Sequence, residues 1–385
     1  MSEHILAAFV PLVDCAVLVA AREKGFAREH GIDLSLVREP SWSSLRDHLN
    51  LGHVDCAHAL APLPIASALG VGHVEAEMLV PFVLNRGGNA ITLATSLATE
   101  IERRSSQPPS PVDWAKGLSR ALMLRNKPLT LAMVHAFSGH NFELRYWLAA
   151  GGVHPDRQVR IVAIPPPLMV ESLAAGHVDG FCVGEPWNSL AVERGIGRIV
   201  ATKSQLFPRG VEKVLAVRPT LATDRARLDA LLKALSAAAA WVDAPSHREE
   251  TAAILSRQEY LGVPAAVIAC SLAGKLELGN GDALDDPDFL YFARHDASFP
   301  ATHEALWIYA QMLRWGQLPA RAELRERAAD VFRPDLYIGA LGPRATADAQ
   351  VLGAFDRIEF SARGIDAYLD QFELYTPFVD THSTP

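Results

Sequence analysis

The sequence predicts an α/β protein with two lobes, each built on a doubly wound, mostly parallel sheet. Strands and helices are predicted to alternate in the same order in two parts of the chain, and the tetrapeptide Gly-His-Val-Asp occurs at the same step of both series. The 385 residues also suffice for two or three domains with sizeable cores. Alternating strands and helices need right-handed crossovers, which place helices on both faces of each sheet.

The first series is strand, helix, strand, helix, strand. Apolar or alternating runs predict the strands, and Gly31 and Gly52 are suited to ending the helices because glycine readily adopts the left-handed conformation. The predicted elements are a strand at 5–10, a helix at 17–30, a strand at 32–36, a helix at 42–50 and a strand at 54–57.

The second series repeats this order. We expect a strand at 129–134, a helix at 140–150 ended by Gly151-Gly152, a strand at 159–164 and a helix that begins at Pro167. The second Gly-His-Val-Asp starts at Gly176 and the first at Gly52, at similar distances after the preceding helix-ending glycine. The matched sequence and spacing indicate a structural repeat.

The rest of the chain completes the predicted domain organisation. The polar, proline-rich stretch 103–111 is typical of a surface loop, 228–242 is a strong helix candidate, and 277–300 is rich in loop residues. We therefore expect a discontinuous lobe I at 1–95 plus 215–385, with a helical C-terminal region. Lobe II is expected at 120–210, with a ligand cleft between the lobes.

Composition excludes several classes of function. Lys and Arg total 36 against 44 Asp and Glu, so the net charge of −8 disfavours direct binding to nucleic acid. No run of about 18 apolar residues predicts a membrane span. The four cysteines are far apart and are expected to be reduced, and the N-terminal residues do not resemble a secretory leader, so we expect a cytoplasmic protein.

The strand-to-helix turns contain the candidate ligand-binding residues. In open α/β sheets, ligands lie beyond the carboxyl ends of strands, next to the N-termini of helices. These turns are rich in hydrogen-bond donors, which suit a small anion with several acceptor oxygens. They comprise the segments 41–44, 137–141 and 184–188.

Each candidate also has a purely structural interpretation. Trp42 would serve as a core aromatic, His140 as a polar residue at a helix start, Ser43 or Ser44 as a helix cap, and Trp187 as a plug on the lobe surface.

Catalytic and metal-binding motifs are not found in the sequence. It has no GxSxG, HExxH, P-loop or GxGxxG motif, so we expect a protein that is not an enzyme and uses no cofactor. His48, His53 and His58 are five residues apart, a spacing that does not place them on one helix face, so no metal site is predicted.

Several longer segments resemble the nitrate-binding and bicarbonate-binding proteins of ABC importers, which have the type II periplasmic-binding fold. The resemblance extends over most of the chain, and HNFELRYWLAAGG and GEPWN are its most specific motifs. The segments are SWSSLRD from Ser41, LNRGGNAIT from Leu84, HNFELRYWLAAGG from His140, PPPLMV from Pro165, FCVGEPWN from Phe181, Glu212-Lys213 and Arg314-Trp315-Gly316.

This resemblance implies a set of ligand-binding residues. In nitrate-binding members a Trp, a side-chain amide, a His and a Lys surround the anion, and these correspond here to Trp42, Asn89, His140 and Lys213. The family usually has Gln at the position of Asn89. Lys213 has an alternative interpretation as a surface cation paired with Glu212. Neighbouring positions in the same motifs, Ser41, Gly88, Gly139, Glu185 and Pro186, are further candidates.

Within the family, the chain is most similar to the cytoplasmic nitrate/nitrite sensors of the NasS type. The resemblance then implies that nitrate or nitrite releases an RNA-binding antiterminator response regulator (ANTAR-type, NasT-like), so that the chain contacts neither nucleic acid nor a membrane directly. The alternative is the anion-binding component of a nitrate or bicarbonate ABC importer without its leader. We further expect that Ala at Lys213 or His140 abolishes anion binding with little effect on the unliganded fold.

Overall fold

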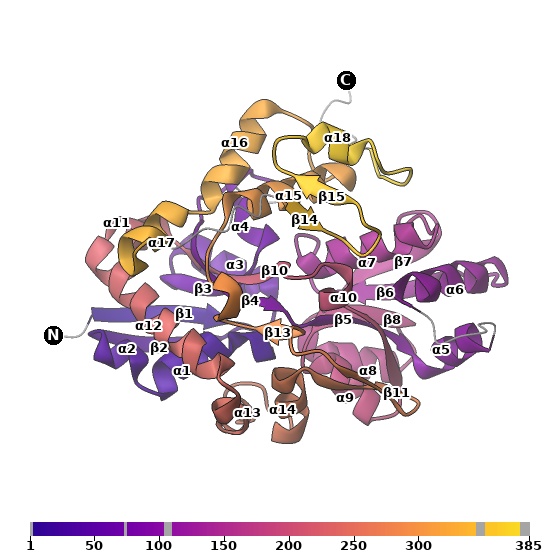
Figure 1. Cartoon of the computed structure of the whole chain (residues 1–385), viewed down its shortest axis with the longest axis horizontal. Coiled ribbons are helices and arrows are strands. Elements are labelled where there is room, and N and C mark those ends of the chain that lie inside the picture. Colours follow the sequence, from indigo (N-terminus) through magenta and orange to yellow (C-terminus); the bar gives the residue numbers. More distant parts are fainter. Residues whose placement is uncertain (1–2, 73–74, 104–109, 344–350, 378–385) are drawn as a thin grey trace.

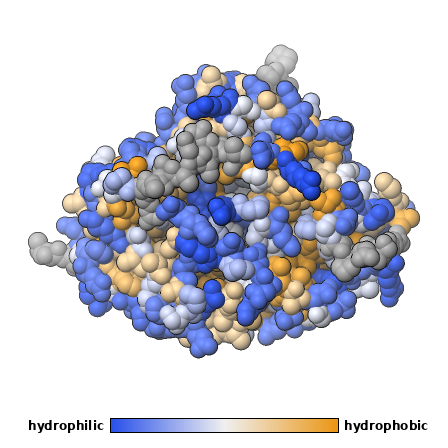
Figure 2. All heavy atoms as spheres, in the orientation of Figure 1, coloured by the Kyte–Doolittle hydropathy of each residue, from blue (hydrophilic) through white to orange (hydrophobic). Residues whose placement is uncertain are grey.

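The computed structural model describes residues 3–72, 75–103, 110–343 and 351–377. It has two α/β lobes side by side, and a C-terminal region that contacts both of them (Figure 1). The predicted two-lobed α/β fold is therefore confirmed. The face shown in Figure 2 is mainly hydrophilic, with scattered hydrophobic residues.

Lobe I contains a six-stranded sheet in the order β13-β4-β10-β3-β1-β2. Its strands β1, β2 and β3 are parallel, whereas β10 runs antiparallel to both β3 and β4, so the sheet is mixed. The strands are β1 (Glu3–Phe9), β2 (Ile32–Arg38), β3 (Cys56–Leu60), β4 (Leu79–Gly87), β10 (Val211–Val217) and β13 (Leu290–Tyr291). The helices are α1 (Ala16–Glu23), α2 (Phe26–Glu29), α3 (Trp42–Leu51), α4 (Pro62–Ala68), α11 (Pro219–Thr223) and α12 (Arg225–Asp243), with the 3-10 helix η1 (Val13–Cys15).

Lobe II contains a five-stranded sheet in the order β7-β6-β8-β5-β9. Strands β6, β7 and β8 are parallel, and β5 runs antiparallel to β8 and β9. The strands are β5 (Asn89–Ala94), β6 (Leu129–Met133), β7 (Val159–Ala163), β8 (Gly180–Gly184) and β9 (Gly197–Thr202). The helices are α5 (Thr95–Glu102), α6 (Pro111–Met123), α7 (Gly139–Ala150), α8 (Met169–Ala174), α9 (Trp187–Glu193) and α10 (Lys203–Leu206), with η2 (Pro166–Leu168).

The predicted repeat is present in the structure. The two aspartates of the repeated tetrapeptide, Asp55 and Asp179, make equivalent hydrogen bonds to the first strand of their own lobe. Asp55 Oδ2 accepts from the backbone N–H of Leu6 at 2.9 Å, and Asp179 Oδ2 accepts from that of Thr130 at 2.8 Å. The tetrapeptide thus joins the third strand of each series to the first. The order β2-β1-β3 in lobe I matches β7-β6-β8 in lobe II.

The chain crosses between the lobes at two places, which changes the expected boundaries. Gly87 and Gly88, with φ of 71° and 85°, turn the chain from β4 directly into β5 of the other sheet. Residues 89–94 therefore pair in lobe II, although the sequence prediction placed them in lobe I. The return crossing lies between β9 and β10. These two crossing strands, β5 and β10, form antiparallel pairs in sheets that we expected to be mostly parallel, and β13 adds an antiparallel pair with β4.

Two other sequence predictions also change. The helix expected at 17–30 is divided into α1 and α2 at Gly25, whose φ of 84° interrupts it. Part of the loop-rich stretch 277–300 forms a hairpin of β11 (Lys275–Gly279) and β12 (Asp282–Asp285). The loop predicted at 103–111 lies mostly outside the described residues. Within those residues, no helix is long and apolar enough to cross a membrane.

The C-terminal region bonds to both lobes. Gln317 Nε2 donates to the backbone oxygen of Ala136 at 3.0 Å and the backbone N–H of Phe355 donates to Leu206 O at 2.9 Å, both in lobe II. Val80 of β4 in lobe I pairs with Phe332. The remaining elements are η3 (Pro245–His247), α13 (Arg248–Leu255), α14 (Ala265–Ala273), η4 (Arg294–Asp296), α15 (Thr302–Arg314), α16 (Ala322–Val331), α17 (Pro334–Leu341), β14 (Val351–Gly353), β15 (Glu359–Ser361) and α18 (Ile365–Leu369).

Candidate functional site

The four principal candidates come from both lobes and are completely buried. Trp42 begins α3 and Lys213 lies in β10, both in lobe I, while Asn89 begins β5 and His140 lies in the first turn of α7 in lobe II. Each of these four residues is 0% exposed to solvent.

Serine caps place two of these residues at helix starts. Ser41 caps α3 by accepting from the backbone N–H of Ser44 at 3.2 Å, and Ser138 caps α7 by accepting from that of Asn141 at 3.0 Å. The first N–H groups of a helix have no partner inside the helix and carry partial positive charge. His140 therefore lies where α7 favours negative charge. Ser41 acts here as the cap, the role that we considered for Ser43 or Ser44.

Lys213 is the centre of a buried ion-pair network. Its Nζ lies 2.8 Å from Asp14 Oδ2 and 2.8 Å from Glu212 Oε1, and 5.6 Å from the ring centroid of Trp42. Asp14 Oδ1 in turn lies 2.8 Å from His58 Nε2. Lys213 does pair with Glu212, as the alternative interpretation required, but it is not a surface cation.

A second buried lysine extends this network across the lobes. Lys203 Nζ lies 2.6 Å from Glu143 Oε1 and donates to the backbone oxygen of Val211 at 2.9 Å. It also pairs with Glu212 Oε2 at 2.5 Å. Because Lys203 and Glu143 belong to lobe II and Glu212 belongs to β10 of lobe I, the Lys203–Glu212 pair connects the two lobes.

Asn89 and His140 join this network on the lobe II side. Asn89 Nδ2 donates to both carboxylate oxygens of Glu143, at 3.0 and 3.3 Å, so its Oδ1 is the amide atom without a partner. His140 Nε2 is 3.7 Å from Glu212 Oε1, beyond hydrogen-bonding distance. The structure thus brings all four predicted residues to one network, with Asn89 connected through Glu143 and Lys203.

Burial and pairing set the charges in the network. Burial lowers the pKa of His140 to about 3, so its imidazole is neutral near pH 7. Burial also raises the pKa of Glu143. Burial acts to raise the pKa of Glu212, but Lys203 and Lys213 outweigh it and hold that pKa well below its usual range. Both lysines stay charged, because their carboxylate partners outweigh burial and raise their pKa values.

Several buried polar atoms around the network have no hydrogen-bond partner. A neutral imidazole has one donor and one acceptor, so His140 leaves one of each unsatisfied. Buried polar groups in native proteins nearly always have partners, since an unsatisfied one costs about 1–3 kcal/mol. The site is therefore suited to a small polar ligand. The unpartnered atoms are Trp42 Nε1, His58 Nδ1, Asn89 Oδ1, and His140 Nδ1 and Nε2.

Two candidate glycines act through their lack of a side chain. A Cβ on Gly139 would lie 2.5 Å from Glu212 Oε2 and 3.0 Å from Glu143 Oε1, so only glycine leaves room for the network at the start of α7. Gly88 has a φ of 85°, which a side chain would strain, at the crossing between the lobes.

Glu185 and Pro186, joined by a cis peptide bond, directly follow Gly184, where an added Cβ would lie 3.4 Å from Asn89 Oδ1 and Asp14 Oδ2 of the network. Glu185 Oε2 accepts from the backbone N–H of Ser189 at 3.2 Å and from Ser271 Oγ at 3.3 Å, while its Oε1 has no partner. Burial raises the pKa of Glu185 to about 7. Its backbone oxygen accepts from Val13 at 2.8 Å, which attaches this turn to lobe I.

Sequence reasoning missed four members of the network: Asp14, His58, Glu143 and Lys203. Asp14 had a usable signal, because it interrupts an otherwise apolar stretch. Among the described residues, no group of His, Cys, Asp and Glu has the arrangement of a metal site. His58 instead forms a hydrogen bond with Asp14.

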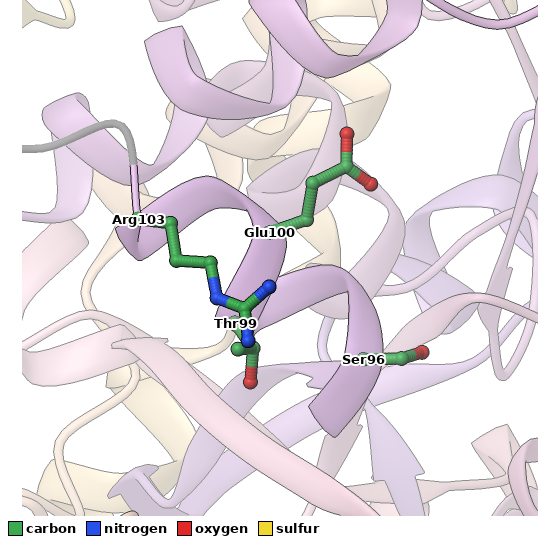
Figure 3. Close-up of a pocket in the computed structure, with 4 residues that line it drawn as sticks. All are labelled: Ser96, Thr99, Glu100 and Arg103. Carbon is green, nitrogen blue, oxygen red and sulfur yellow. The ribbon is translucent and has the colours of Figure 1, made fainter.

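A separate surface hollow of about 420 Å³ lies on α5 of lobe II, lined by Ser96, Thr99, Glu100 and Arg103 (Figure 3). Glu100 in this hollow pairs with Arg125 at 2.6 Å. None of the predicted site residues lines it, so it is distinct from the network between the lobes.

Comparison with known proteins gives relatives over nearly the whole chain. The chain is 31% identical to the nitrate/nitrite binding protein NrtA of Synechococcus elongatus, covering 94% of this chain and 84% of the relative. It is 35% identical over 95% of its length to the nitrate import ATP-binding protein NrtC of Synechocystis, but spans only 55% of that longer protein.

A solved structure shares the fold closely. The periplasmic nitrate-binding protein NrtA from Synechocystis superposes with a TM-score of 0.90 at 29% identity, covering 97% of this chain and 99% of that one. The model of the NMT1-like family matches residues 2–256, which contain both series of strands and helices and every residue of the network. The chain accordingly belongs to the NMT1-like family.

Proposed function

We propose that the chain binds nitrate or nitrite in the buried network between its lobes. The observation that carries this proposal is the set of unpartnered buried atoms beside Lys213. Trp42 Nε1 and one nitrogen of His140 are donors without acceptors, and Lys213 supplies positive charge next to them. A small planar oxyanion satisfies such donors, which are worth about 1.5–3 kcal/mol each when they bond to a charged group.

Asn89 has a different role from the one that the resemblance implied. Its amide nitrogen is held by Glu143, so Asn89 offers an acceptor, Oδ1, to the site. Nitrate has only acceptor atoms and would contact this amide favourably only after the amide turns. Hydrogencarbonate carries one O–H donor, and it therefore belongs in any comparison of ligands.

We propose further that the bound anion is handed to an ABC importer, so that the chain is an importer's binding component. This role is supported by the similarity over 94% of the chain to NrtA, a nitrate/nitrite binding protein, and by the TM-score of 0.90 to the periplasmic NrtA. Two lobes that enclose a ligand at their interface are also suited to capture and release through relative motion.

A second candidate role, as a cytoplasmic sensor, rests on the resemblance of the sequence motifs to sensors of the NasS type. In the sensor role, the anion would release an ANTAR-type antiterminator partner, and linkage requires that partner to weaken anion binding by the same factor.

Calorimetric titration of the purified, ligand-free chain tests the binding function. We expect nitrate or nitrite to bind more tightly than sulfate, which serves as the larger-oxyanion control. Trp42→Phe and His140→Leu should each weaken binding at least about tenfold, because each removes a donor to an anion. His48→Leu is the matched control, because His48 pairs with Glu39 outside the network. Absence of binding by every small anion would refute the proposal.

Gel filtration separates the two roles. The purified chain is mixed with the antiterminator, with or without saturating nitrate, and in parallel with the importer's membrane components. A complex with the antiterminator that nitrate dissociates would establish the sensor role. Nitrate-dependent association with the membrane components, together with no antiterminator complex, would establish the importer role.

A further inference from the structure

The Arg314-Trp315-Gly316 segment has no part in the network between the lobes. Arg314 ends α15, where the C-terminal region meets α7, and it is 4% exposed. Its Nε lies 3.4 Å from the backbone oxygen of Leu374. Nη1 is buried without an acceptor, although Tyr146 and Asp356 lie near enough to act on the charge of Arg314.

Aromatic rings surround this guanidinium. Its central carbon lies 3.5 Å from the ring centroid of Phe372, 4.4 Å from that of Tyr146 and 4.5 Å from that of Trp315. Burial lowers the pKa of Arg314 to about 10, so the group remains charged near pH 7. Aromatic faces attract the cation but provide no acceptor for its N–H groups.

Arg314 lines a cavity of about 290 Å³ together with Tyr146, whose buried hydroxyl lies near Asp356 but makes no hydrogen bond of normal length. Burial raises the pKa of Tyr146, so this hydroxyl is a donor. The same cavity is lined by Asp356 and Glu373. It also includes the C-terminal end of α7, where backbone carbonyls carry partial negative charge. The cavity therefore contains both unsatisfied donors and negative groups.

We propose that this cavity binds a small zwitterion of the α-amino acid type. The carboxylate accepts from the guanidinium of Arg314 and the hydroxyl of Tyr146, and the ammonium group faces Asp356, Glu373 and the end of α7. A simple anion would meet the two carboxylates, and a simple cation would meet Arg314, so neither matches both parts of the lining. The volume is near the lower end for ligand sites, about 300–1,000 Å³, which favours a small compound.

Calorimetry of the full chain with glycine, alanine, glutamate and glutamine tests this site. Propionate, which lacks the ammonium group, and ethylamine, which lacks the carboxylate, are the ligand controls. We expect at least one amino acid to bind, with neither control matching it. Tyr146→Phe and Asp356→Asn should each weaken that binding about tenfold, because the first removes a hydrogen bond to the ligand carboxylate and the second removes a negative charge beside the ammonium group.

Tyr309→Phe is the matched control variant, because the Tyr309 hydroxyl donates to the backbone oxygen of Arg321 and Tyr309 does not line the cavity. Nitrate binding between the lobes should be unchanged in all three variants, which keeps this test independent of the proposed function. The proposal is overturned if no amino acid binds at millimolar concentration, if propionate binds as tightly as alanine, or if Tyr146→Phe behaves like Tyr309→Phe.

Discussion

Replacement of Lys213 by Met should destabilise the unliganded protein as well as abolish anion binding. Lys213 is completely buried and lies 2.8 Å from Asp14 and 2.8 Å from Glu212. Its loss leaves Asp14 with only His58 and Glu212 with only Lys203, and the removal of one partner from a buried ion pair costs about 3–5 kcal/mol of the free energy of unfolding. This is a large part of the typical total of about 5–15 kcal/mol. For Lys213 the buried ion pairs therefore predict a different outcome from the sequence-based expectation of an unchanged unliganded fold.

Urea unfolding followed by circular dichroism measures this loss. The double variant Lys213→Met with Asp14→Asn should be more stable than Lys213→Met alone, because it removes the carboxylate charge that has lost its lysine partner, whereas Glu212 still pairs with Lys203. The loss in free energy of unfolding of the single variant should also be smaller at about pH 5 than at about pH 8. The carboxylates that have lost Lys213 take up a proton more readily at the lower pH, which removes their buried charge. A single variant within about 1 kcal/mol of the wild type at both pH values would refute the assignment of Lys213 as a paired buried cation.

Three further predictions concern single residues in the network or next to it. His140→Leu should lose nitrate binding yet change the free energy of unfolding by less than about 1 kcal/mol, because neither ring nitrogen has a partner. Calorimetry and urea unfolding check this. Glu185, with a pKa raised to about 7, keeps its proton in the folded state when the unfolded state has released it. Wild-type stability should therefore fall by up to about 3 kcal/mol between about pH 4.5 and pH 7, and Glu185→Gln should remove this slope in urea unfolding at a series of pH values. Gly139→Ala should weaken nitrate binding at least about tenfold, because the new Cβ would lie 2.5 Å from Glu212 Oε2. Gly353→Ala is the control, because a Cβ there meets no atom within 4 Å. Equal affinities of the two variants in calorimetry would contradict this prediction.

Local sequence patterns predicted most of the fold. Helix-ending glycines such as Gly31 and Gly52, and the repeated tetrapeptide, correctly indicated the two series of strands and helices. The lobe boundary at β5 was not predictable in this way. Residues 89–94 form an ordinary apolar strand, and the sheet that they join depends on the turn at Gly87 and Gly88 rather than on their own composition.

The site was predicted only where it coincides with helix starts or family motifs. Trp42 and His140 follow capping serines, which are visible in the sequence. Glu143 and Lys203 are 60 residues apart, and their pairing depends on how α7 and α10 pack together. Glu143 also accepts from Asn89 Nδ2, which turns the expected donor of Asn89 away from the site. No pattern within the segment around Asn89 specifies this orientation.

The C-terminal region limits how the two lobes can separate. A molecule joined only by the two crossing segments could open like a hinge, but Gln317 and Phe355 also bond to lobe II, and Phe332 pairs with lobe I. A wide rotation would break these bonds or carry the whole C-terminal region with one lobe. The radius of gyration in small-angle X-ray scattering should therefore change little when the anion binds. Deletion of the region from residue 317 onward should make this change in the radius of gyration larger. The unliganded form should also be less compact for its number of residues.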